Sequence, residues 1–255
     1  MWSCIRNSRI QTCPLVPLSP IEIAIALTAI VAGVVVQSSV GFGAGLVAAP
    51  VLLIVDQGFV PGPMLAANWS IAVLMGWHEW RAIDWKGAAI ALGGRTLGMF
   101  PAVLAFGALS ATTFSCIFAA LILLAVLLSL AGWTIRPTPR NTFLVGTVSG
   151  FTGTFASMGG PPMALLYQNE PGSRLRATLA VFFVVGGILS LTALSFVGHF
   201  GKYQLLLTAI LLPGVFVGFL LSHLTAPFLD AKNTRPAVLI VSCLAALVVL
   251  GRAIW

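Results

Sequence analysis

Long apolar runs separated by short polar turns fill almost the whole chain. A helix needs about 20 apolar residues to cross the ~30 Å hydrocarbon core of a bilayer. Eight segments of suitable length are predicted near residues 20–55, 63–80, 85–107, 111–133, 142–169, 176–198, 203–225 and 236–254. The turns between them leave no room for a further domain. The pattern therefore predicts an all-α polytopic membrane protein, with residues 1–19 as an N-terminal tail.

Two of these segments are interrupted by residues that do not suit a helix in lipid. Gly41-Phe-Gly-Ala-Gly45 divides the first segment into 20–40 and 44–55, and Ser157-Met-Gly-Gly-Pro-Pro162 divides the fifth into 142–157 and 161–169. A backbone N–H or C=O without a partner costs several kcal/mol in hydrocarbon, so such breaks persist where they line a cavity. Interrupted segments at corresponding positions of two halves point to the binding site of a secondary transporter.

The halves of the chain, residues 20–135 and 136–255, are predicted to be repeats. The two breaks lie about 116 residues apart, and Gly94-xxx-Gly98 in the third segment matches Gly214-xxx-Gly218 in the seventh about 120 residues later. Counts of Lys and Arg in the loops do not fix the topology. If every segment crosses and the N-terminus is cytoplasmic, eight of these residues lie inside and four outside. The counts are the same if the two broken segments are re-entrant and the N-terminus is outside. We favour re-entrant hairpins for the broken segments, so that each half crosses three times and the halves are inverted.

The amino-acid composition limits the kinds of partner that the chain can have. The chain is 59% hydrophobic and 7% charged, against roughly a quarter charged in soluble domains. The net charge of +7 comes from 13 Lys and Arg that fall mostly singly or in pairs between apolar runs. This is typical of loops beside a membrane and excludes a nucleic-acid partner. We expect a lipid bilayer as the surroundings.

Each break is predicted to begin a new helix, and a helix start suits an anion. Its free N–H groups and positive dipole end attract negative charge, and glycine lets an oxyanion approach the backbone. Arg95 lies at the centre of the third segment, where an arginine costs roughly 2.5–3.5 kcal/mol and marks a pathway or a partner. The predicted substrate-binding residues are Gln37, Ser38, Ser39, Gly41, Gly43, Ala44, Gly45, Asn68, Arg95, Ser157, Gly159, Gly160, Pro161 and Thr178.

Each of these features also has a structural interpretation. Glycines serve close helix packing, Ser and Thr hydroxyls bond back to their own helix, and Asn68 and Thr178 cap helices. Arg95 is then a structural arginine that snorkels to the interface or bonds to the backbone. These alternatives remain open from the sequence. His78-Glu79, Arg81 and Asp84 form either a proton-coupling group or an interfacial charged turn.

The motifs resemble those of a known family. Gly41-Phe-Gly-Ala-Gly with Leu-Val-Ala-Ala-Pro50, and Met158-Gly-Gly-Pro-Pro-Met-Ala-Leu-Leu-Tyr167, are similar to the paired Gly-x-Gly-Gly-Gly and Gly-Gly-Pro-Pro signatures of the TauE/SafE sulfite exporter family. Ala44 departs from the first signature. The resemblance covers residues 21–255. It implies a permease of the bacterial inner membrane for sulfite, sulfonates, sulfoacetate or another small organic anion.

The sequence therefore predicts a secondary transporter for a small anion, without cofactor, metal or catalytic residues. There is no P-loop, no Gly-x-Ser-x-Gly elbow and no dense His/Asp/Glu set in the chain, so ATPase, hydrolase and metalloenzyme functions lack support. A passive anion channel, a non-transporting membrane component and a small intramembrane enzyme are the alternatives. The coupling proton or cation and a homodimer are left open.

Overall fold

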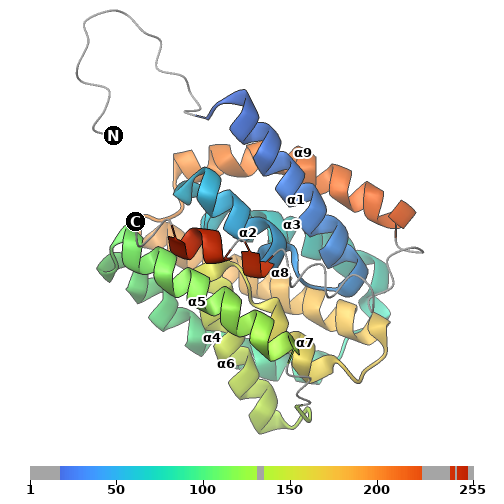
Figure 1. Cartoon of the computed structure of the whole chain (residues 1–255). Coiled ribbons are helices and arrows are strands. Elements are labelled where there is room, and N and C mark those ends of the chain that lie inside the picture. Colours follow the sequence, from blue (N-terminus) through green and yellow to red (C-terminus); the bar gives the residue numbers. More distant parts are fainter. Residues whose placement is uncertain (1–17, 131–134, 226–241, 245, 252–255) are drawn as a thin grey trace, which may run out of the picture.

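The computed structural model describes residues 18–130, 135–225, 242–244 and 246–251, and over these residues the chain is helical without strands (Figure 1). The helices are α1 (Pro20–Val40), α2 (Ala44–Val55), η1 (Gln57–Phe59), α3 (Gly62–Glu79), η2 (Trp80–Ala82), α4 (Trp85–Ala108), α5 (Ala111–Leu130), α6 (Pro139–Ala156), α7 (Gly160–Tyr167), α8 (Gly172–Phe196) and α9 (Lys202–Thr225). Residues 242–244 and 246–251 are helical as well. The predicted all-helical class is confirmed.

Among the described residues, five stretches are long and apolar enough to cross a membrane, which makes the chain a multi-pass membrane protein. They are Pro20–Val40, Gln57–Trp77, Trp85–Phe106, Gly172–Phe196 and Lys202–Ser222. The fourth predicted segment contains a shorter apolar helix, Thr112–Leu127, and the eighth contains Ser242–Gly251. Most of the N-terminal tail, residues 1–17, and much of the eighth segment lie outside the described residues.

Local capping explains where the helices begin. Ser19 and Glu22 form a capping box at the start of α1, in which each side chain accepts a hydrogen bond from the backbone N–H of the other residue, at 3.3 and 2.7 Å. Thr138 accepts from Asn141 N before α6, and Pro20 and Pro139 occupy the first turns. These contacts satisfy N–H groups that have no partner inside the helix.

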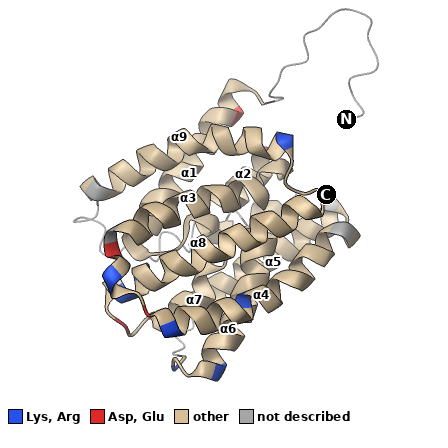
Figure 2. Cartoon of the chain, turned by 180° about the vertical axis from the view of Figure 1, so that it is seen from behind, with Lys and Arg blue, Asp and Glu red and all other residues tan. Residues whose placement is uncertain are grey.

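Helices from the two halves of the chain interlock. α4 packs along α6, α1 along α9 and α3 along α8 (Figure 1). Figure 2 shows charged residues mostly at helix ends, with long uncharged helix bodies between them. On the outer faces, Leu104 of α4 and Leu220 of α9 are 74% and 68% exposed. Such an apolar exterior suits lipid and not water.

The matched glycine pairs lie at matched interfaces. A Cβ on Gly94 or Gly98 would come closer than 3.0 Å to a backbone carbonyl oxygen of α6, that of Phe143 or Thr147. A Cβ on Gly214 or Gly218 would come equally close to α1, at Ile30 and Val34. These glycines therefore set the distance between the paired helices.

A tyrosine–aspartate hydrogen bond ties each short broken helix to a helix of the other half. Tyr203 at the start of α9 donates to Asp56 Oδ2, just after α2, at 3.0 Å. Tyr167 at the end of α7 donates to Asp84 Oδ2, just before α4, at 3.1 Å. The two ties join equivalent places, although the donor lies on the short helix in one case and on the long helix in the other.

Gly93 and Gly94 give a matched test of the α4–α6 interface. Alanine at position 94 would press against Phe143 O, whereas at position 93 the nearest atom is 3.7 Å away. Both substitutions improve helix propensity by about 1 kcal/mol, but overpacking costs about 1–3 kcal/mol. We expect Gly94→Ala to lower the melting temperature by several degrees and Gly93→Ala to leave it equal or raised, measured by thermal denaturation in detergent. Equal melting temperatures would contradict this packing.

Candidate functional site

The first break is held open by glycine conformation and by one glutamine. α1 ends at Val40, and Gly41 and Gly43 adopt φ angles of 96° and 119°, which side chains with a Cβ rarely reach. Gln37 is 3% exposed, and its Oε1 accepts a hydrogen bond from Ala44 N at 3.2 Å. A side chain from the end of α1 thus satisfies the first N–H of α2.

The second break is held by side chains of α3 and α6 and by Ser157 in the break itself. α6 ends at Ala156, and Ser157 has a left-handed φ of 59°. Asn68 Nδ2 of α3 donates to Ser157 O at 3.1 Å, and Ser157 Oγ donates to Pro61 O at 2.9 Å. Ser149 Oγ of α6 donates to Gly159 O. The carbonyl oxygens of Ser157 and Gly159 therefore have partners.

The two breaks touch each other in the interior. A Cβ on Gly45 would clash with Ser157 O, and a Cβ on Gly160 would lie 2.6 Å from Phe42 Cβ. Backbone of one half therefore lies directly against backbone of the other half. Only residues without a side chain permit this approach.

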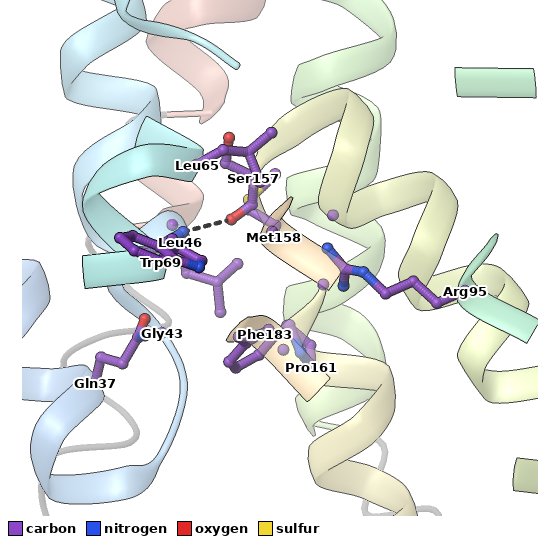
Figure 3. Close-up of a pocket in the computed structure, with 16 residues that line it drawn as sticks. Gln37, Gly43, Leu46, Leu65, Trp69, Arg95, Ser157, Met158, Pro161 and Phe183 are labelled. Atoms are coloured by element: carbon purple, nitrogen blue, oxygen red, sulfur yellow. Dashed lines mark hydrogen bonds between the residues drawn. The ribbon is translucent and has the colours of Figure 1, made fainter. Parts of the chain in front are cut away.

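A small pocket with a cavity volume of about 30 Å³ lies at this contact. Figure 3 shows it between α3 and the two breaks, with Arg95 entering from α4. Its lining consists of Gln37, Gly43, Gly45, Leu46, Leu65, Asn68, Trp69, Arg95, Gly153, Ser157, Met158, Gly159, Gly160, Pro161, Phe183 and Gly187.

Arg95 is buried without a matching anion. It is 2% exposed, and its guanidinium carbon lies 4.8 Å from the ring centre of Phe182. Nη2 donates to Ser190 Oγ at a long 3.5 Å, while Nε and Nη1 have no hydrogen-bond partner among the residues that the structure describes. Over the same residues, no carboxylate forms an ion pair with Arg95. Figure 3 shows the guanidinium directed toward the start of α7.

Glycines make room for this side chain. A Cβ on Gly186 of α8 would overlap the guanidinium, and a Cβ on Gly153 would lie 3.2 Å from Nη1. Ser190, the hydrogen-bond partner of Arg95, also shares a 2.8 Å hydrogen bond with Thr154. α8 and α6 therefore leave a narrow space in the apolar interior, which the charged side chain of Arg95 fills.

The structure brings together nine of the fourteen predicted site residues. The pocket lining includes Gln37, Gly43, Gly45, Asn68, Arg95, Ser157, Gly159, Gly160 and Pro161. The other five, Ser38, Ser39, Gly41, Ala44 and Thr178, do not line it.

Four of these five residues make contacts within the fold. Ser39 Oγ donates to Val35 O of its own helix at 2.9 Å, and Thr178 Oγ1 accepts from Asp84 N at 3.0 Å. Ala44 N is bonded to Gln37. A Cβ on Gly41 would meet Arg176 at 3.0 Å. Ser38 Oγ is buried without a partner in the described part of the chain.

Sequence reasoning missed several lining residues. Trp69 and Phe183 come from α3 and α8, and Gly187 lies against Trp69. One available signal was the Gly186-Gly187 pair in the middle of an apolar segment, because adjacent glycines there indicate close approach of another group.

The charged turn after α3 is engaged in structural contacts. Glu79 and Arg176 form an ion pair that joins α3 to α8. Asp84 caps α4 through Gly87 N at 3.1 Å and accepts from Tyr167. The side chain of His78 lies outside the described residues. The proton-coupling interpretation of this turn stays a prediction.

The comparisons with known proteins agree with this geometry. A family model described as Sulfite exporter TauE/SafE matches residues 25–249, a range that contains both breaks and every residue of the pocket. Neither curated proteins nor solved structures give a match.

Two arginines distinguish a binding charge from a structural one. Removing an uncompensated buried charge relieves a desolvation cost, whereas breaking an ion pair leaves the partner charge alone. We expect ligand-free Arg95→Met to melt at or above the wild-type temperature and Arg176→Met, which leaves Glu79 unpaired, to melt several degrees lower. Differential scanning fluorimetry in detergent measures both. A large loss of stability in Arg95→Met would assign Arg95 a structural role.

Proposed function

We propose that this chain, which belongs to the TauE/SafE sulfite exporter family, a family of membrane transporters and not of enzymes, is a secondary transporter. Its proposed substrate is a small sulfur-containing or organic anion, such as sulfite, a sulfonate or sulfoacetate. The proposed membrane is the inner membrane of a bacterium. The observation that supports this proposal is Arg95, a buried cation beside a pocket between two helix starts, with two donors that have no partner in the described part of the chain. An anion completes such a site.

The two helix starts contribute unequally to the proposed anion site. The first turn of α2 offers backbone N–H groups at Gly45 and Leu46, and the pocket reaches both residues. In the first turn of α7, Pro161 and Pro162 have no N–H to offer. Arg95 enters on the α7 side and brings the full positive charge there. Partial charge from one half and a guanidinium from the other would hold the anion between them.

The packing supports two related halves within one membrane domain, and we propose that the halves are inverted. If α1/α2 correspond to α6/α7, α3 to α8 and α4 to α9, then the α1–α9 contact corresponds to α6–α4, and α3–α8 corresponds to itself. The glycine pairs and the tyrosine–aspartate ties follow the same correspondence. With both breaks re-entrant, the eight segments give three crossings in each half. Rocking of one half against the other would then expose the pocket to alternate sides.

The chain itself contains no P-loop, so uphill transport would use an ion gradient. Passive conduction is the competing outcome. Electrical recording from the reconstituted protein separates the two, since a channel carries currents far above what a turnover cycle can supply.

Arg95→Gln tests the anion site. Glutamine keeps hydrogen-bonding atoms but removes the charge, and hydrogen bonds to charged groups contribute about 1.5–3 kcal/mol. We expect the half-saturation concentration for sulfite flux in proteoliposomes to rise at least tenfold. Arg81→Gln, at an exposed position on η2, is the control and should behave as wild type. An unchanged half-saturation concentration would remove Arg95 from the site.

Gly159→Val tests the second break. Its φ of −73° suits any residue, but a Cβ would lie 2.9 Å from Ser149 O and 3.3 Å from Arg95 Nη1. The added methyl groups would obstruct the pocket while the protein still inserts. We expect flux to be abolished at normal membrane levels, with Gly201→Val in an open loop as the control. Undiminished flux would contradict a pocket at this break.

A further inference from the structure

Asn68 places an unused hydrogen-bond acceptor beside the pocket. Its Nδ2 donates to Ser157 O at 3.1 Å (Figure 3). A backbone carbonyl can only accept, so this bond fixes the orientation of the amide. Asn68 Oδ1 is buried and accepts no hydrogen bond from any residue in the described ranges. An unsatisfied buried acceptor costs about 1–3 kcal/mol, so a ligand that donates to it would gain affinity.

The other unsatisfied polar atoms of the lining are donors. Trp69 Nε1 is buried without a partner, as are Nε and Nη1 of Arg95, when contacts with the described chain are counted. Trp69 and Asn68 are neighbours on α3, while Arg95 reaches the pocket from α4. The lining thus offers donors for an anionic group and one acceptor for a group that carries hydrogen.

The charge of the lining limits the charge of the ligand. Arg95 is the one charged side chain among the sixteen lining residues. A single negative charge neutralises it, whereas a dianion would leave an uncompensated charge in an apolar interior, which is costly. A water molecule would satisfy Asn68 Oδ1 but would not balance Arg95.

We propose that the bound substrate is a singly charged oxyanion that also carries a neutral hydrogen-bond donor, and that Asn68 Oδ1 accepts a hydrogen bond from this donor. Hydrogensulfite and hydroxyalkanesulfonates have this chemistry, and sulfate does not. The oxyanion lies against Arg95 and Trp69, and the hydroxyl or acid O–H donates to Asn68 Oδ1. This inference rests on the proposed transport of anions and adds the charge and the donor that select among them.

The test compares three probes by isothermal titration calorimetry on the purified wild-type protein. 2-Hydroxyethanesulfonate and ethanesulfonate differ by one hydroxyl, and sulfate carries a second charge. A site built to pair with a hydroxyl discriminates strongly against the analogue that lacks it. We expect 2-hydroxyethanesulfonate to bind about tenfold more tightly than ethanesulfonate and at least tenfold more tightly than sulfate. Equal affinities for the two sulfonates overturn the proposal.

The variant Asn68→Leu tests whether Asn68 accepts the hydrogen bond from the substrate hydroxyl. Because both sulfonates are measured in the same variant, any general damage from losing the contact to Ser157 cancels in their ratio. We expect the tenfold ratio to fall to about one in Asn68→Leu and to persist in Ser39→Ala, whose hydroxyl is bonded to its own helix. A ratio that persists in Asn68→Leu overturns the role of Asn68. If that variant fails to fold, the wild-type comparison still decides the donor requirement.

Failure of this inference is distinguishable from failure of anion transport. If the two sulfonates bind equally and Arg95→Gln weakens both, the anion site stands and the donor requirement is wrong. If none of the three probes binds while Arg95→Gln still weakens sulfite flux, the inference alone is wrong. If none binds and Arg95→Gln leaves sulfite flux unchanged, the proposed anion site is overturned together with the inference.

Discussion

An interrupted helix inside an apolar bundle must find partners for the backbone groups that it frees, and this requirement organises the centre of the protein. Gln37 bonds to the first N–H of α2, Ser149 bonds to Gly159 O, and Asn68 bonds to Ser157 O. The partners of the second break come partly from the first half of the chain. The second break therefore depends on the fold of the first half, since hydrocarbon offers no replacement for these hydrogen bonds.

Local sequence predicts the breaks but not what completes them. Glycine and proline interrupt a helix wherever they stand in this pattern, so 41–45 and 157–162 were readable from the chain. The matched glycines at 94, 98, 214 and 218 were readable too, because their spacing is local. Trp69 and Phe183 were not, because they reach the pocket through the packing of α3 against α8, which joins residues more than 90 positions apart.

The hydrogen-bond partners of the Ser hydroxyl groups could not be predicted from the local sequence either. Ser39 and Ser149 both lie near a break, yet Ser39 bonds to Val35 of its own helix while Ser149 crosses to Gly159. Helix rotation decides between these outcomes, and an apolar segment with small residues on several sides does not specify its rotation. The difference between the eight predicted segments and the five candidate spans among the described residues has a similar cause. Because α6 is rich in Gly, Ser and Thr, its hydropathy falls short of that of a membrane-spanning helix, although α6 packs tightly against α4.

Under the proposed correspondence, the two halves match in the order of their helices and differ in charge. Gln37 of α1 and Gly153 of α6 stand at matching distances before their breaks, and Arg95 of α4 corresponds to Val215 of α9. A Cβ on Gly153 would lie 3.2 Å from the guanidinium of Arg95. A chimera built from two copies of the first half would carry two such arginines, and one built from two copies of the second half would carry none. If the proposed correspondence of the halves holds, the charge that the site can neutralise would be set by where the halves differ.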